Sequence, residues 1–529
     1  MRRTNGVRRT GGFRAALAQI NPCVGDLEGN VERCLAAIAT ARSQDAALVV
    51  LPEMAVPGYP PRDILFDPSF VEAVTKANLD LAHRARGGPP VVVGTLTLGD
   101  RKVPNHPGLY NAALLLDGGE ARLVGAKRLL PSHDVFFEPR WFRPGPALPP
   151  TVISGKQAGV LVCEDLWDER YDVHPGAELV ADGAELLICI SASPYRRGVT
   201  EQRLYHARRQ SCPLLYVNLC GANDELIFDG RSFVIDGDGG IIARLTGFEE
   251  EVRVVDLDID GEVELEIEAP AGKRENSEEE LYQALVLGVR DFAQKNRLER
   301  VFLGLSGGID SAVVAVVAAD ALGPEHVTAI AIPSRYNDPH STTSARELAD
   351  ALHIHFEVVE LERLHVAAEE TLGDLLDGGV TSENIQARLR AMILMGFVNR
   401  YGGMLLNASN KTELALGYAT IYGDMAGTLC PIGDVTKPDV IALAHWINSV
   451  RGVIPRFIME RLPAAELRPG QVDPFDYPKI APVMERLVQE NRSDVTLRRS
   501  EHKRWQMGVI LKVSEKSFGS GRMIPITRR

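Results

Sequence analysis

One segment, VFLGLSGGIDSAVVAVVAADALG (301–323), constrains the fold of this chain more than any other. It begins as an apolar strand, passes through a glycine-rich loop, and continues as a helix rich in alanine and valine. Glycines let the backbone turn tightly and approach an anion, and the N-terminus of the next helix points N–H groups at it. The apolar run HVTAIAIPS predicts another strand soon afterwards. This order predicts the beginning of a doubly wound α/β nucleotide-binding domain.

The glycine-rich loop supplies candidate ligands for the phosphates of ATP. Asp310 would place a negative carboxylate beside a negative phosphate. This arrangement is explained if Asp310 holds Mg²⁺, which binds both groups. The GK[ST] ending of a Walker A loop is missing. A turn that only caps a helix is the simpler interpretation, but the strand–loop–helix setting favours phosphate binding. The residues concerned are Gly304, Leu305, Ser306, Gly307, Gly308, Ile309, Asp310 and Ser311.

The chain has 529 residues, which is too long for a single ordinary core, so at least two domains are expected. From Phe13 short apolar strands alternate with helix-period stretches, which is typical of a layered α/β domain. A polar, charge-rich stretch at 266–280 is the best linker candidate. We therefore predict a first domain at 13–265 and a second at 281–529. Residues 1–12 are basic and glycine-rich, and we expect a disordered tail rather than a transit peptide.

Composition and charge exclude several classes of protein. The net charge of -13 argues against non-specific binding to nucleic acid or to an anionic membrane. No apolar run reaches the roughly 20 residues that span a bilayer. The seven cysteines are irregularly spaced and form no CxxC pair, so we expect a reduced, cytoplasmic protein without disulfides or a zinc site.

Three residues lie at the ends of predicted strands, Glu53, Lys127 and Cys163, and in this order they resemble the catalytic triad of the nitrilase superfamily, which implies an amidase. A thiol becomes a good nucleophile only when it loses its proton, so Glu53 would be the general base for Cys163. Cys163 would attack an amide carbon and form a thioester. Lys127 and the backbone N–H of Glu164 are candidates to stabilise the oxyanion. Taken alone, Cys163 would more simply be a small buried hydrophobe.

Several segments resemble known families. SGGIDS resembles the pyrophosphate loop of the N-type ATP pyrophosphatases, which adenylate a substrate oxygen. The segments 382–395, 407–427, 463–471 and 516–527 are similar to substrate segments of the NAD+ synthetases. LPE, KRLLP and CEDLW, in this order, resemble the Glu–Lys–Cys triad of the nitrilase superfamily. The resemblance covers nearly the whole chain from Phe13 and implies an N-terminal α-β-β-α sandwich.

The resemblance also implies roles for further residues. Glu138 would position Lys127. Glu413 would share Mg²⁺ with Asp310, and Lys437 would neutralise the charge of departing pyrophosphate. The implied glutamine contacts are His133, Glu164, Ser193 and Arg197, and the implied contacts to deamido-NAD+ are Asn384, Arg388, Glu413, Asp424 and Lys503.

By this resemblance the chain would hydrolyse glutamine, adenylate nicotinic acid adenine dinucleotide with MgATP, and let ammonia displace AMP to give NAD+. Family members are homo-oligomers, and the same is expected here. Two alternatives stay open. One is another pyrophosphate-loop amidotransferase with a different acceptor. The other is a decayed sensor of nucleotide or glutamine, because His133, Val199 and Ala408 depart from the family pattern.

Overall fold

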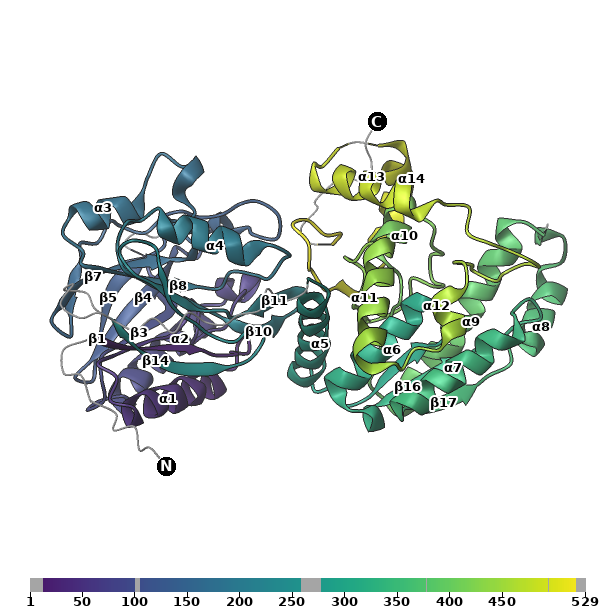
Figure 1. Ribbon diagram of the computed structural model, residues 1–529, viewed down its shortest axis with the longest axis horizontal. Helices are drawn as coiled ribbons and strands as arrows, with labels where there is room; N and C mark the ends of the chain where they lie inside the picture. The colour runs from purple at the N-terminus through teal and green to yellow at the C-terminus, as the bar shows by residue number, and fades with distance from the viewer. Residues whose placement is uncertain (1–12, 100–104, 258–276, 377, 493, 520–529) are drawn as a thin grey trace, which may run out of the picture. The chain divides into compact units, whose positions relative to one another are not determined.

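A computed structural model describes residues 13–99, 105–257, 277–376, 378–492 and 494–519 (Figure 1). The chain divides into two compact units, one of Met1–Asn223 with Phe228–Lys273 and one of Asp224–Ile227 with Arg274–Arg529. The predicted tail at 1–12 lies outside the described residues. So does most of the predicted linker, whose last four residues, 277–280, are already helical.

The first unit contains two six-stranded mixed sheets. In both of them the central strands pair in parallel, and antiparallel strands lie at the edges. The first sheet has the order β14-β1-β2-β3-β4-β5 and the second β13-β12-β9-β8-β7-β6. The strands of the first sheet are β1 (Phe13–Gln19), β2 (Leu48–Val50), β3 (Val91–Leu98), β4 (Leu109–Asp117), β5 (Glu120–Ala126) and β14 (Glu251–Leu257). Those of the second are β6 (Thr151–Ile153), β7 (Lys156–Val162), β8 (Leu186–Ser191), β9 (Leu214–Asn218), β12 (Phe233–Ile235) and β13 (Ile241–Arg244).

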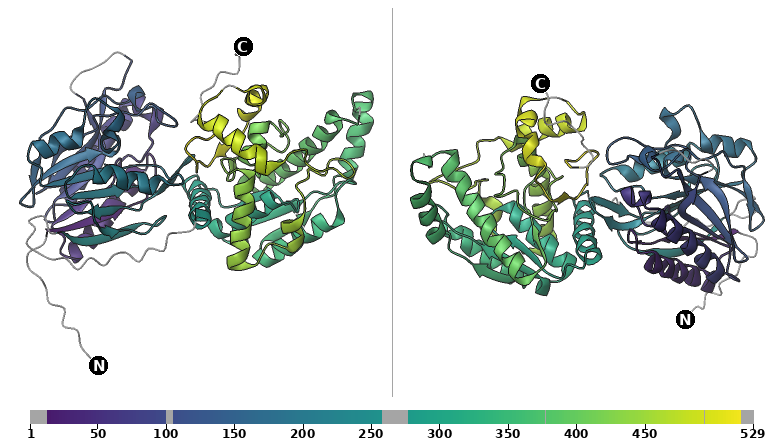
Figure 2. Two further views of the ribbon diagram at one scale, coloured as in Figure 1. Left: turned by 45° about the horizontal axis from the view of Figure 1, so that its top comes forward. Right: turned by 180° about the vertical axis from the view of Figure 1, so that it is seen from behind.

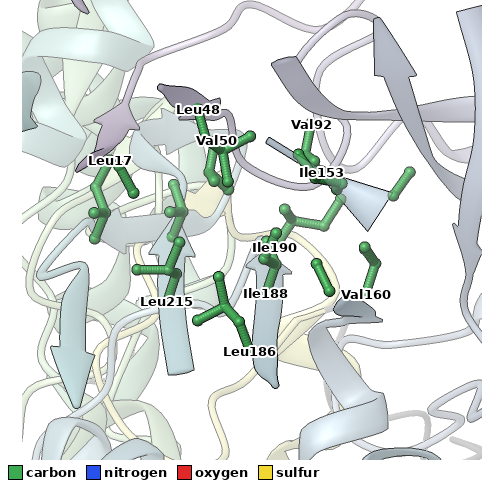
Figure 3. Packing of buried hydrophobic residues seen from close by; sticks show 14 of the residues in the cluster. Leu17, Leu48, Val50, Val92, Ile153, Val160, Leu186, Ile188, Ile190 and Leu215 are labelled. Carbon is green, nitrogen blue, oxygen red and sulfur yellow. The ribbon is translucent and has the colours of Figure 1, made fainter. Parts of the chain in front are cut away.

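The two sheets pack face to face through branched aliphatic side chains. Leu17 and Val50 of the first sheet meet Ile188 and Leu215 of the second in one buried cluster (Figure 3). Helices α1 (Leu27–Ser43) and α2 (Pro68–Arg84) pack on the first sheet. Helices α3 (Pro175–Ala181) and α4 (Val199–Arg208) bury apolar side chains against the outer face of the second. A short hairpin adds β10 (Cys220–Asn223) and β11 (Leu226–Asp229). This is the predicted α-β-β-α sandwich.

The second unit contains one fully parallel sheet of order β17-β16-β15-β18-β19-β20. Counted along the chain this order is 3-2-1-4-5-6, that of a doubly wound dinucleotide-binding sheet. The strands are β15 (Val301–Gly304), β16 (Val327–Ala331), β17 (His355–Val358), β18 (Met404–Leu406), β19 (Leu429–Cys430) and β20 (Val509–Ile510). The chain leaves β15 and β18 towards opposite sides, so the switch point lies between them, and ligands bind outside the carboxyl ends of such strands.

Helices surround this sheet. Helix α6 (Ile309–Leu322) is apolar on all sides and fully buried along most of its length, as expected of a core helix. Helix α9 (Val380–Tyr401) packs against β15 and β18, and α5 (Ser277–Lys295) packs against α6. Figure 2 shows the same unit from two further sides. The other helices are α7 (Pro339–Leu352), α8 (Glu362–Leu372), α10 (Lys411–Leu416), α11 (Lys437–Arg451), α12 (Arg456–Glu460), α13 (Tyr477–Gln489) and α14 (Val495–Arg504).

The predicted fold class is confirmed for both units. The strand expected at the start of segment 301–323 corresponds to β15, and the strand expected in HVTAIAIPS (326–334) corresponds to β16. Among the described residues, no helix is long and apolar enough to cross a bilayer. All seven cysteines lie in the described part and are free.

Candidate active sites

The first unit places a lysine between two buried carboxylates. Glu53 follows β2, Lys127 follows β5, and Glu138 begins a short 3-10 helix. Lys127 Nζ lies 3.0 Å from Glu53 Oε1 and 2.7 Å from Glu138 Oε1, and all three side chains are almost completely buried. Burial alone would lower the pKa of Lys127, but the charges of Glu138 and Glu53 raise it well above its usual value. Lys127 is therefore a fixed cation.

Further donors fix the two carboxylates. Asn111 Nδ2 donates to Glu53 Oε1 at 2.6 Å, and the backbone N–H of Ala192 donates to Glu53 Oε2 at 2.6 Å. The hydroxyl of Tyr59 donates to Glu138 Oε1 at 3.0 Å. Glu53 thus has hydrogen-bond partners on both oxygens, which orients it as a base. The sequence reasoning missed Asn111 and Tyr59, although Tyr59 lies in the LPEMAVPGYPP segment that carries Glu53.

Cys163 comes directly after β7, at a sharp turn with φ of 47°. Its side chain is buried, and burial raises the pKa of its thiol well above the usual range. The charge of Glu53 raises this pKa further, and the charge of Lys127 lowers it. Both groups therefore act on the sulfur, and Glu53, Lys127 and Cys163 form one site. The resting thiol is neutral, so a base must take its proton before attack.

Asp165 ties the cysteine turn to the lysine loop. Its Oδ1 accepts from the backbone N–H of Arg128 and of Leu129, both at 2.9 Å, and its Oδ2 accepts from Val162 N–H at 3.1 Å. Burial raises the pKa of Asp165 to about 6. Asp165 was not among the predicted residues. The only signal in the sequence is its place two residues after Cys163.

The four predicted glutamine contacts lie in different environments. Ser193 is buried in the segment that follows β8. Glu164 is partly buried, accepts a hydrogen bond from Tyr171 at 2.9 Å, and has a pKa raised by burial to about 7. His133 is exposed, with its ring against Phe136. Arg197 is partly buried in the turn before α4. Their contact with glutamine stays a prediction.

The second unit contains a cavity of about 340 Å³ at the switch point of its sheet. Asp424, Lys437 and Glu413 line it, and so does most of the predicted phosphate loop. Gly307 does not line the cavity. It has φ of 77°, and a Cβ on it would lie 2.4 Å from the carbonyl oxygen of Ser341, so glycine is required there for packing against α7. The loop residues that do line the cavity are Gly304, Leu305, Ser306, Gly308, Ile309, Asp310 and Ser311.

Lys437 joins the two acidic residues of this cavity. Its Nζ lies 2.5 Å from Asp310 Oδ2 and 3.3 Å from Glu413 Oε1. Asn410, the N-cap of α10, donates to Asp310 Oδ1 at 3.0 Å. Burial, and then the charge of Asp310, raise the pKa of Glu413 to about 7. Two carboxylates and one ammonium thus converge beside the phosphate loop.

Four predicted substrate residues meet at the loop 417–424. Asn384 Oδ1 accepts from the Thr420 hydroxyl at 2.7 Å, and Arg388 Nε donates to Ile421 O at 3.1 Å. Lys503 Nζ donates to the carbonyls of Gly417 and Ala419 at 2.8 and 2.7 Å. Asp424 Oδ1 accepts from Thr420 N–H at 2.6 Å. Only Asp424 of these four lines the cavity, and the other three contact the loop instead.

Sequence reasoning missed a polar cluster at the cavity wall. Glu466 accepts from Asn337 Nδ2 at 2.9 Å and pairs with Arg461 at 2.9 Å, and Arg461 also donates to Ser341 Oγ at 2.8 Å. Arg390 donates to Asn337 Oδ1 at 3.1 Å and is buried, which lowers its pKa to about 10. All five residues line the cavity. Glu466 lies in the PAAELRPGQ segment, which gave the only signal.

The first unit is an α-β-β-α sandwich with Glu53, Lys127 and Glu138 in one buried cluster near Cys163, and the second is a doubly wound unit with a cavity at its switch point. Residues 14–265 match the carbon-nitrogen hydrolase family, and residues 281–517 match the NAD synthase family. The glutamine-dependent NAD(+) synthetase of Synechocystis sp. is 37% identical over 98% of this chain and 99% of its own length. That of Thermotoga maritima is 36% identical over 98% and 99%. The chain therefore belongs to the family of glutamine-dependent NAD(+) synthetases.

A solved structure agrees with this assignment. The glutamine-dependent NAD+ synthetase from Acinetobacter baumannii, in complex with ADP, superposes with a TM-score of 0.78 at 30% identity and covers 98% of each chain. A second one, from Cytophaga hutchinsonii, has a TM-score of 0.82 at 22% identity and shows the shared fold.

Proposed function

We propose that this chain releases ammonia from glutamine at Cys163 and uses it, with ATP, to convert deamido-NAD+ to NAD+. Membership of the ligase family supports the overall reaction. The single observation that carries the glutamine half is the charge arrangement around the thiol. Lys127 is fixed between Glu53 and Glu138, and the charges of Glu53 and Lys127 both act on Cys163.

In the proposed first step, Glu53 takes the proton of the Cys163 thiol while the sulfur bonds to the side-chain amide carbon of glutamine. Lys127 and the backbone N–H of Glu164 face the negative charge that develops on the amide oxygen. Glu53 then returns the proton to the amide nitrogen, and ammonia leaves as the thioester forms. Finally Glu53 takes a proton from water as hydroxide adds to the thioester carbon; the C–S bond then breaks, Glu53 returns the proton to the Cys163 sulfur, and glutamate leaves.

In the proposed second step, the carboxylate of deamido-NAD+ attacks the α-phosphorus of ATP in the 340 Å³ cavity and pyrophosphate leaves. Backbone N–H groups of the loop and the hydroxyls of Ser306 and Ser311 would orient the phosphates. Lys437 would balance the charge of the departing pyrophosphate. Ammonia then attacks the adenylated carbonyl, AMP leaves with its bonding electrons, and the nitrogen loses one proton to water, which leaves the amide.

The residues present fit a magnesium ion, although the described residues hold no cluster of three metal-ligating side chains. Mg²⁺ prefers one or two carboxylates and takes its other ligands from water and substrate phosphates. Asp310 and Glu413 offer such a pair, and Lys437 lies between them at 2.5 and 3.3 Å. A bound Mg²⁺ would neutralise phosphate charge, and these two residues would hold it.

Two further features belong to the proposal: an oligomeric state that the resemblance implies and a location that the cysteine pattern indicates. We expect a homo-oligomer, and exposed Met392, Met395 and Tyr401 on α9 provide apolar surface for subunit contact. We also expect a cytoplasmic location, and the seven free cysteines agree with a reducing compartment.

The proposal is tested by incubating the protein with MgATP, deamido-NAD+ and either glutamine or ammonium, and measuring NAD+ and AMP. Formation of both products with both donors is expected. Turnover with ammonium alone would mean that the first unit does not supply ammonia. No AMP with either donor would favour the sensor alternative, which the His133, Val199 and Ala408 departures motivate. Thermal stabilisation by a different carboxylate, but not by deamido-NAD+, would favour another amidotransferase.

A further inference from the structure

A second buried cation, Arg203, lies in the first unit outside the Glu–Lys–Cys cluster. It belongs to α4 and its side chain is 1% exposed. Its Nη1 donates to Asp229 Oδ1 at 2.8 Å and to Oδ2 at 3.0 Å. Its Nη2 donates to the carbonyls of Ser193 at 2.7 Å and Pro194 at 3.3 Å, and its Nε donates to Ser193 Oγ at 3.2 Å. All three nitrogens of the guanidinium therefore have acceptors.

The partners of Arg203 lead directly to the catalytic base. Ser193 N–H also donates to Asn218 Oδ1 at 2.9 Å, and Asn218 Nδ2 donates back to Ser193 O at 3.1 Å. Ala192, which directly precedes Ser193, donates its backbone N–H to Glu53 Oε2 at 2.6 Å. Arg203 and Asn218 thus fix the short segment that orients one oxygen of Glu53.

The Arg203–Asp229 pair costs desolvation energy that apolar residues of similar size would avoid. Because the pair makes so many directed contacts, it also fixes the local conformation of the segment that contains Ser193 and Pro194. Electrostatics support a link to the site. Burial lowers the pKa of Arg203, the charge of Asp229 raises it, and a charge on Cys163 raises it too.

We propose that Arg203 is a positioning residue for glutamine hydrolysis, which fixes the 192–194 segment so that Ala192 N–H orients Glu53. Arg203 Nε donates a hydrogen bond to Ser193 Oγ. The hydroxyl of Ser193 therefore still has its own proton to donate, and the α-carboxylate of glutamine is a suitable acceptor. Asp229 serves Arg203 by compensating its charge. This inference rests on the proposed glutaminase function, and none of these residues belongs to the synthetase site.

The test compares Arg203→Lys with Arg208→Lys. Lysine keeps the charge but loses the fork that reaches both Asp229 and Ser193. Arg208 is exposed on the same helix, and its Nε donates to Gly239 O at 3.0 Å, so it is a matched control. Each protein is assayed for kcat and KM with glutamine and for turnover with ammonium. Rates are divided by the folded fraction measured by circular dichroism.

We expect Arg203→Lys to lower kcat with glutamine about 100-fold, as a misplaced catalytic group does, with ammonium turnover unchanged and Arg208→Lys like wild type. Asp229→Asn, which keeps the size of the side chain, should lower the same kcat in the same direction. Wild-type kcat in both variants, or a loss that disappears after correction for folded protein, would overturn the inference. Absence of glutamine turnover in the wild type, with ammonium turnover intact, would overturn the proposed function and this inference together.

Discussion

At the scale of single residues, the first unit buries a thiol next to a carboxylate that is held by three donors. Burial raises the pKa of Cys163, while Lys127, Asn111 and the Ala192 N–H all donate to Glu53. In the proposed mechanism, Glu53 therefore removes the thiol proton during the reaction. Glu138 holds Lys127 in place through its own contact, from its Oε1 to Lys127 Nζ.

In the second unit, Asp310 has two partners of different kinds. It accepts from Lys437 and from Asn410, and it lines the cavity beside Glu413. We predict that Asp310→Asn lowers turnover about 10- to 100-fold with glutamine and with ammonium alike, because both donors use the same adenylated intermediate. Pyrophosphate release is the measurement. Asp320→Asn, a half-exposed position on the same helix, is the control, and undiminished pyrophosphate release in Asp310→Asn would remove Asp310 from the metal role.

The Asp165 carboxyl gives a prediction of pH dependence. Its folded pKa, about 6, is above the unfolded value of 3.8, so the folded state binds the proton first as the pH falls. The stability that Asp165 contributes through this proton is complete below pH 3.8 and is lost as pH rises through 6. Its ionisation at neutral pH costs roughly 3 kcal/mol.

We therefore expect the Tm of wild type, relative to that of Asp165→Asn, to be higher at pH 5 than at pH 7.5. Asparagine cannot titrate, so the difference between the two melting curves isolates this group. A difference that is the same at both pH values would contradict the assignment.

At the scale of elements, the turn between β15 and α6 depends on one glycine. Gly307 has φ of 77°, and a Cβ there would lie 2.4 Å from Ser341 O, so an alanine must both strain the backbone and push the loop away from α7. We predict that Gly307→Ala weakens ATP binding and lowers stability by about 1–3 kcal/mol. Gly402→Ala is the control, because Gly402 has φ of 72° but open space around it. Isothermal titration with ATP should show near-normal affinity only in the control. Equal affinity in both variants would show that contact with α7 is unimportant.

Regular elements and motif residues were predictable because their signals are local. The apolar strand, glycines and buried helix of 301–323 are read from adjacent residues, and β15 and α6 lie there. Glu53, Lys127 and Cys163 were predictable because each follows an apolar strand. The first strand, loop and helix predicted a doubly wound domain, but they did not predict which of the known strand orders it has.

Long-range contacts were not predictable in the same way. Asn111 lies inside β4, where a polar residue reads as an ordinary strand position, and only the pairing of β4 with its neighbours brings it to Glu53. The same holds for Arg203, which meets Asp229 across 26 residues. Asn384, Arg388 and Lys503 converge on a loop between 417 and 424 that has no periodic pattern. Their partners follow from folding and not from spacing.

At the scale of the whole molecule, the proposed function assigns two chemistries with different requirements to the two units. The first would rely on Glu53, Lys127 and Cys163, and the second would use Asp310 and Glu413 beside the predicted phosphate loop. We predict that chelation of Mg²⁺ by EDTA abolishes NAD+ formation with either donor, while slow hydrolysis of glutamine to glutamate persists. Loss of glutamate formation on chelation, restored by Mg²⁺ without ATP, would show that the metal also serves the first unit.

The central claim is that the thiol of Cys163 frees the nitrogen that the second unit uses. The most direct measurement is the steady-state rate of NAD+ formation by Cys163→Ala with glutamine and with ammonium, beside Cys212→Ala, a buried cysteine of the same unit, as control. We expect Cys163→Ala to lose turnover with glutamine, by at least about 1,000-fold, and to keep the wild-type rate with ammonium. Retained turnover with glutamine, or an equal loss with both donors, would contradict it.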